Sequence, residues 1–153
     1  MNAMKNLILA GILVLTVWGC NGPQSVNEDW QPLFNGENLE GWDIKFTHSP
    51  MGVNYKNTFR VEEGLLKVRY DEWDSLNNIF GHLMTKESYS HYKVRAEYRF
   101  VGEQVKGGAD WAYRNNGIMI HSQSAESMRL DQDFPVSIEV QLLGGDGSGP
   151  VPT

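Results

Sequence analysis

The chain has 153 residues, with 13 Lys and Arg against 19 Asp and Glu, and its formal net charge is −6. This length accommodates one domain, and an apolar fraction of 41% is sufficient for a hydrophobic core and argues against wholesale disorder. The acidic balance argues against a nucleic-acid partner, which normally requires a basic patch, and the single cysteine excludes a disulfide within the chain.

Residues 1–19 have the features of an export signal. Lys5 gives a positive start, and the apolar run at residues 7–18 is shorter than the roughly 20 residues of a membrane-spanning helix. Gly19 directly before Cys20 resembles a bacterial lipoprotein cleavage site, at which the cysteine is lipidated. An ordinary secretory signal and a buried free cysteine are the alternatives. We therefore expect a lipid-anchored protein of the cell envelope, in the periplasm or on the outer-membrane surface, with residues 20–29 as a polar tether.

The body of the chain alternates apolar and polar residues, which is the period-two pattern of β-strands. The expected strands lie at residues 42–46, 66–70, 92–100, 118–121 and 136–143. Glu63-Gly64 predicts a hairpin turn before the second of them, and no stretch after residue 23 sustains helical periodicity. Several short antiparallel strands with glycine-rich turns predict an all-β sandwich or jelly roll.

Residues 144–150 are a glycine-rich loop, and the sequence ends three residues later. A two-sheet sandwich usually closes with further strands after such a loop. We therefore expect residues 30–153 to be the N-terminal part of a β-sandwich domain that is incomplete at its C-terminus, with unpaired strand edges.

Strand alternation divides the side chains between a core face and an outer face. The expected core set is Val94, Ile118, Ile120, Ile138 and Val140. The polar residues on the opposite faces are Glu97, His121, Glu139 and Gln141. Two carboxylates and an imidazole on one face suit general acid–base work, hydrogen bonds to a sugar, or a metal ion. The alternative is a solvated sheet face with salt bridges to neighbouring arginines.

Exposed aromatic residues are expected in the glycine-rich stretch at residues 107–116. Trp111 and Tyr113 would suit stacking on sugar rings, or they would anchor the loop by burying themselves. Asp110 and Asp146 carry the oxygen ligands that calcium prefers, but neither belongs to a spaced ligand motif. We expect no cofactor, and a divalent metal ion is the remaining alternative.

Three motifs in order resemble the 3-keto-disaccharide hydrolase domain family. They are WQPLFNG at residues 30–36 with LEGW at 39–42, NNGIMIH at 115–121, and SIEVQLL at 137–143. The resemblance implies a concanavalin-like jelly roll and cleavage of glycosidic bonds in sugars oxidised at one ring carbon. His121 stands where many members have arginine, and the family's C-terminal strands are missing. Together with the outer-face pattern, the resemblance assigns His121 and Glu139 to catalysis and Glu97, Trp111, Asn116 and Gln141 to substrate binding.

The resemblance also suggests a mechanism. A ketone acidifies the neighbouring C–H, a base removes that proton, the glycosidic oxygen leaves by elimination, and water adds back. This route needs one base and an oxyanion stabiliser, not the carboxylate pair of ordinary glycosidases. His121 is the candidate base because an imidazole titrates at about pH 6.5, and Glu139 would orient it or share the role. A non-catalytic carbohydrate-binding lipoprotein and a structural envelope lipoprotein are the rival interpretations.

Overall fold

The computed structural model describes residues 29–145. The chain divides into two units, Met1–Gln31 and Pro32–Thr153, and the second unit contains every strand of the described residues. The predicted export signal, Cys20 and Asp146 lie outside the described residues. Within residues 29–145, no helix has the length and apolar character needed to cross a membrane.

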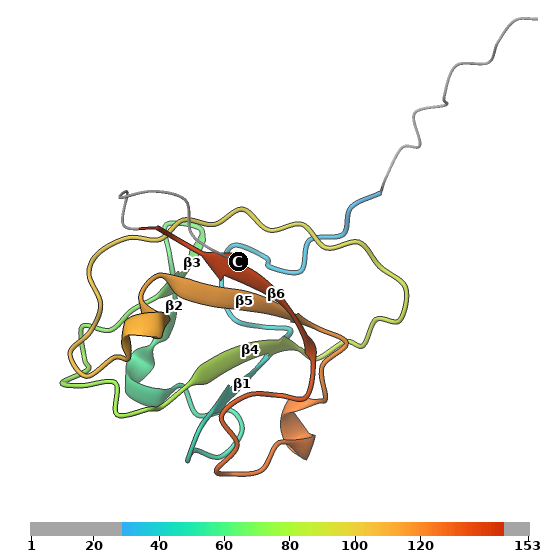
Figure 1. The fold of residues 1–153 in the computed structure, drawn as a ribbon. Helices are drawn as coiled ribbons and strands as arrows, with labels where there is room; N and C mark the ends of the chain where they lie inside the picture. The colour runs from blue at the N-terminus through green and yellow to red at the C-terminus, as the bar shows by residue number, and fades with distance from the viewer. Residues whose placement is uncertain (1–28, 146–153) are drawn as a thin grey trace, which may run out of the picture. The chain divides into compact units, whose positions relative to one another are not determined.

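The described part of the chain is all-β, as the sequence predicts. Its strands are β1 (Trp42–Phe46), β2 (Phe59–Glu62), β3 (Leu65–Val68), β4 (Gly81–Thr85), β5 (Asn115–Ile120) and β6 (Ile138–Leu143), shown in Figure 1. Single 3-10 turns lie at η1 (Tyr55–Asn57), η2 (Asp110–Ala112) and η3 (Ala125–Ser127). The strands form three antiparallel pairs, β1–β4, β2–β3 and β5–β6.

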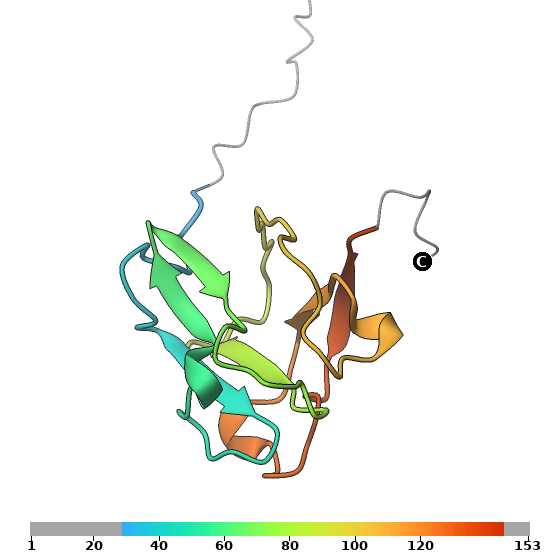
Figure 2. The same ribbon diagram turned by 90° about the vertical axis from the view of Figure 1, so that its left-hand side faces the viewer.

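The β2–β3 pair is a tight hairpin, and its turn is the one predicted from the sequence. Glu62 pairs with Leu65, and the two residues between them, Glu63 and Gly64, have φ values of 56° and 73°. Positive φ at both central positions matches the right-handed twist of the flanking strands. In Figure 2 this hairpin is drawn to the left of β4, and the β5–β6 pair is drawn to its right.

An aromatic cluster forms the core and packs β1 against the start of β2 and Trp73. Phe46 is 2% exposed, and its ring centroid lies 5.2 Å from that of Phe59 and 6.4 Å from that of Trp73. The Trp73 indole N–H donates a hydrogen bond of 2.8 Å to the Thr58 hydroxyl, which satisfies its buried polar atom.

Phe46 also lies across Gly81, its partner in the β1–β4 ladder. A Cβ added at Gly81 would come within 2.7 Å of Phe46 Cδ1, so the aromatic ring occupies the space that a side chain would need. This close approach requires glycine at position 81.

The prediction of a strand at residues 92–100 is wrong, because these residues join no ladder. Their alternation describes which side chains share a face, but an extended segment becomes a strand only when a neighbour supplies the hydrogen bonds.

The predicted core set is wrong: three of its residues are exposed, and the other two, Ile118 and Ile120, are only half-buried and lie outside the core cluster. Val94, Ile138 and Val140 are 40%, 62% and 45% exposed, whereas the buried core cluster is Ile44, Phe46, Phe59 and Trp73. Alternation correctly groups Ile118, Ile120, Ile138 and Val140 on one face of β5–β6. The alternation does not specify which part of the chain packs over that face, and the burial of these side chains depends on that packing.

Replacing Phe46 by alanine should lower the free energy of unfolding by about 3–5 kcal/mol, because it opens a cavity among three aromatic rings. The matched control is Ile138→Ala, which should change stability by no more than about 0.5 kcal/mol because the side chain is mostly in solvent. Urea denaturation of both variants, followed by tryptophan fluorescence, measures the difference. Equal losses would show that the core does not lie around Phe46.

Candidate functional site

The face of the β5–β6 pair that the sequence predicts to be the outer face carries two of the predicted site residues side by side, and the opposite face, with Ile138 and Val140, is exposed as well. In the ladder Met119 pairs with Glu139 and Gly117 pairs with Gln141. Paired residues point to the same face of a sheet, and so do residues two apart. Glu139 and Gln141 therefore share one face, as the alternation predicts, and both are exposed.

Glu139 lies over Gly117, its diagonal neighbour in the ladder. A Cβ built on Gly117 would clash with Glu139 Oε1 and come within 2.7 Å of its Cγ. Glycine at 117 therefore makes room for the carboxylate to lie flat across β5, which explains why a strand interior contains a residue that normally weakens strands.

Hydrogen bonds fix the amide of Gln141. Its Nε2 donates to Asn115 Oδ1 and, at 3.0 Å, to the backbone oxygen of Asn116. The amide nitrogen is used in these bonds, so Oε1 is the atom of Gln141 that remains to accept a bond from a ligand.

Asn116 belongs to the other face of β5, because it pairs with Leu142. Its Oδ1 accepts a bond of 2.8 Å from the backbone N–H of Gly117. The structure therefore separates the Asn116 side chain from Glu139 and Gln141, although all three belong to the motifs that the sequence singles out.

His121 lies just beyond the end of β5, in a turn with φ of 50°. Its backbone N–H donates a bond of 3.2 Å to the Tyr92 hydroxyl, and the two ring centroids lie 5.4 Å apart. Among the described residues, no hydrogen bond joins His121 to Glu139. Glu97 is exposed within segment 92–100, which joins no ladder, so no strand pairing brings it to this face.

A row of aromatic side chains, of which the sequence pointed only to Trp111, continues onto β4. Trp111 in η2 is 59% exposed and stacks on Phe80 at 6.0 Å and 21°. The ring centroids of Phe80 and Phe134 lie 4.7 Å apart, and Phe134 and His82 pack edge-to-face with centroids 5.8 Å apart. We call Trp111, Phe80, Phe134 and His82 the aromatic row. Exposed aromatic rings next to polar groups are suited to stacking on sugar rings.

Phe80, His82 and Phe134 were not among the residues predicted from the sequence. A signal was present, since Phe80 and His82 alternate with Ile79 and Leu83, two residues that pack on the core. That pattern spans too few residues to separate a strand from a loop by periodicity. Phe134 lies in the loop before β6, where no periodicity applies.

His82 is the most constrained imidazole of the site. Its Nε2 lies 2.7 Å from the backbone oxygen of Asp133. Burial lowers the pKa of His82 below its usual value, and the positive charge of Lys45 lowers it further. The hydrogen bond to Asp133 and the carboxylates of Glu139 and Asp133 act in the opposite direction and raise the pKa. The effect of Glu139 on the pKa shows that the carboxylate on β6 and the imidazole on β4 are within electrostatic reach of each other.

Lys45 is paired with His82 across the β1–β4 ladder. It is only 2% exposed, and its ammonium donates a bond of 2.7 Å to the carbonyl of Phe46. Burial lowers the pKa of Lys45, and the carboxylate of Asp131 opposes this.

Within residues 29–145, no group of three or more His, Cys, Asp or Glu side chains is arranged to hold a metal ion. Asp110 opens η2 and is exposed, and its suggested partner Asp146 lies outside the described residues.

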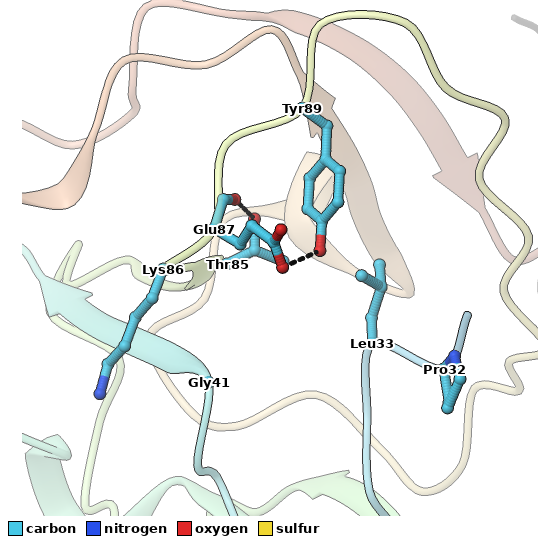
Figure 3. A pocket seen from close by; sticks show the side chains of 7 residues that line it. All are labelled: Pro32, Leu33, Gly41, Thr85, Lys86, Glu87 and Tyr89. Atoms are coloured by element: carbon cyan, nitrogen blue, oxygen red, sulfur yellow. Dashed lines mark hydrogen bonds between the residues drawn. The ribbon is translucent and has the colours of Figure 1, made fainter.

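A separate depression of about 200 Å³ lies at the end of β4, lined by Pro32, Leu33, Gly41, Thr85, Lys86, Glu87 and Tyr89 (Figure 3). The Tyr89 hydroxyl donates to the Glu87 carboxylate at 3.0 Å and so closes one side of it. Its volume is below the roughly 300–1,000 Å³ of ordinary ligand pockets, and none of the predicted site residues lines it.

Comparison with known proteins supports one family. Residues 29–153 match the family described as the 3-keto-alpha-glucoside-1,2-lyase-like domain, which confirms the resemblance drawn from the three motifs. Searches of curated proteins and of solved structures gave no match.

Gly117→Ala should displace the Glu139 carboxylate and lower the free energy of unfolding by about 1–3 kcal/mol, because the new methyl group overlaps the side chain. The same substitution in a Glu139→Ala background should cost less, since the overlapping atoms are gone. A double-mutant cycle by urea denaturation should give a coupling of about 0.5–3 kcal/mol. Strictly additive effects would contradict the packing of Glu139 over Gly117.

Proposed function

Because the chain belongs to the 3-keto-alpha-glucoside-1,2-lyase-like domain family, we propose that it cleaves glycosidic bonds of disaccharides or glycosides that carry a ketone on the sugar ring. The observation that carries this proposal is the face of β5–β6 on which Glu139 and Gln141 stand together, with Glu139 within electrostatic reach of His82 in the aromatic row. Aromatic rings hold the apolar face of a sugar, and polar side chains hold its hydroxyl groups.

The reaction proceeds by elimination followed by addition of water. A base takes the proton from the carbon between the ketone and the anomeric carbon, and the C–H electrons move to the ketone oxygen as an enolate. The enolate re-forms the ketone, a double bond forms to the anomeric carbon, and the glycosidic oxygen leaves with a proton. Water then adds across the double bond. The chemistry needs proton transfer and oxyanion stabilisation, and a single carboxylate is sufficient for it.

Glu139 and His121 are the proton-transfer groups of this proposal. Glu139 is the carboxylate of the outer face, and His121 supplies an imidazole at the end of the neighbouring strand. Of the four residues expected to contact the sugar, this proposal keeps Trp111 and Gln141. Asn116 lies on the other face of β5, and Glu97 lies in a segment that joins no ladder, so neither is placed at this face.

A carbohydrate-binding protein without turnover is the second candidate. It is favoured by the exposure of Trp111, 59%, since an exposed ring stacked on a second ring is suited to binding whether or not a reaction follows.

The chain's placement in the cell is a further part of the proposal. The short apolar run before Gly19-Cys20 supports an exported lipoprotein of the cell envelope, anchored through Cys20. Several acyl chains hold a protein on a membrane firmly, whereas a single chain binds weakly. The motifs that resemble the 3-keto-disaccharide hydrolases support a concanavalin-like jelly roll as the fold of the family to which this chain belongs.

Glu139→Gln should reduce cleavage of a 3-keto-disaccharide by about 10²–10⁴-fold, because the amide has neither the negative charge nor the proton-transfer capacity of the carboxylate. His121→Ala should also reduce cleavage. Sugar binding, followed by tryptophan fluorescence, should persist in both variants. Glu126→Gln on η3 is the matched control and should cleave at the wild-type rate. Wild-type turnover by Glu139→Gln would reject the proposed role, and binding without any turnover in the wild type would favour the second candidate.

Cys20→Ser should move the protein from the membrane fraction to the soluble fraction, because the substituted residue cannot be acylated. Cell fractionation and immunoblotting measure the distribution, with Ser25→Ala as a control that keeps the cysteine. A variant as membrane-bound as the wild type would contradict lipid anchoring at Cys20.

A further inference from the structure

His82 is a histidine that the motifs do not include. It lies in β4, next to Gly81 and Leu83, and Leu83 packs on the core. Alternation along the strand turns His82 to the opposite side, where its ring meets Phe134. Its position therefore follows from the packing of β4 and not from a loop.

The hydrogen bond to Asp133 determines the tautomer of His82. A backbone carbonyl can only accept, so the 2.7 Å contact to Nε2 requires the proton on Nε2. The second ring nitrogen, Nδ1, then carries a lone pair. An imidazole fixed in this way is prepared to accept a proton.

The charged groups around His82 come from three directions. Lys45 faces it from β1, Glu139 acts from β6, and Asp133 lies in the loop before β6. Asp131 acts on Lys45 from the same loop. Burial outweighs the carboxylates and lowers the pKa of His82, so the imidazole is neutral at pH 7 and able to act as a base.

His121 differs from His82 both in its burial and in its hydrogen bonding. It is exposed, and within the described residues its ring has a contact with Tyr92 but no hydrogen bond that fixes which nitrogen carries the proton. An exposed and unfixed imidazole is suited to exchanging protons with solvent and with a departing oxygen.

The aromatic row supplies the position of the substrate. Phe134 is 44% exposed and contacts both Phe80 and His82. A pyranose ring stacked over Phe134 would therefore lie near the imidazole, whose centroid is 5.8 Å from that of the Phe134 ring.

We propose that His82 is a further catalytic residue, whose Nδ1 removes the proton from the carbon next to the ketone while Phe134 and Phe80 hold the sugar ring. This inference rests on the proposed function. The C–H electrons pass to the ketone oxygen and the proton passes to Nδ1. Glu139 stabilises the imidazolium that forms, and His121 is left to deliver a proton to the leaving oxygen.

Deuterium exchange separates these steps. The probe is 3-keto-1,5-anhydroglucitol, which has the ketone but no glycosidic leaving group, so proton removal returns the same compound with deuterium in place of hydrogen. The full chain is incubated with the probe in D₂O, and loss of the C2–H signal is followed by NMR, with a protein-free sample as background. Cleavage of a 3-keto-disaccharide and binding by tryptophan fluorescence are measured alongside.

His82→Gln should reduce the exchange rate by about 10²–10⁴-fold and should bind the probe as the wild type does. His121→Ala should lose cleavage but keep exchange, and His91→Gln, an exposed control histidine, should keep both. In the wild type, the exchange rate should rise with pH to a plateau, with a midpoint below about 6.5, the ordinary imidazole value.

The outcomes distinguish the two proposals. Exchange at the wild-type rate in His82→Gln overturns the role of His82 and leaves the proposed function intact. A wild type that neither exchanges nor cleaves overturns both. If His82→Gln fails to fold, the temperature dependence of the midpoint decides, because the pKa of an imidazole falls on warming and that of a carboxylate hardly changes. A midpoint that stays constant on warming overturns the assignment to an imidazole.

Discussion

The contact between Phe46 and Gly81 is the constraint on which the site depends. The aromatic ring occupies the space above Gly81 and joins Phe59 and Trp73 in the core, so β4 is held with Gly81 and Leu83 toward that core. The alternation of a strand then sends Phe80 and His82 to the opposite side, where both meet Phe134. The packing of one hydrophobic ring thus determines which side of β4 carries the aromatic row and its imidazole.

The register of β5 and β6 is the second constraint. It sets Glu139 beside Met119 and diagonal to Gly117, where the missing side chain leaves room for the carboxylate. A slip of one residue would turn Glu139 and Gln141 to the face of Ile118 and Ile120, because side chains alternate with a period of two. Two of the motifs that resemble the family, at residues 115–121 and 137–143, span these same two strands.

The electrostatics of the site follow from burial. His82 and Lys45 are neighbours across a ladder, and burial lowers the pKa of each. A neutral imidazole beside a carboxylate suits proton abstraction next to a ketone, since the carboxylate stabilises the imidazolium once it forms. The exposed His121 has no such surroundings, which is the physical reason for distinguishing the roles of the two histidines.

The sequence by itself determined the all-β class, the Glu63-Gly64 hairpin and the shared face of Glu139 and Gln141, because turn chemistry and alternation are local properties of the chain. It also determined the family, through motifs at the start, middle and end of the match. The tertiary structure decided what alternation cannot express: that residues 92–100 join no ladder, that Ile138 and Val140 are exposed, and that His82 reaches Phe134 and the electrostatic range of Glu139. Burial and proximity between distant segments depend on which surfaces pack together, and a pattern of period two specifies only the two faces of each strand.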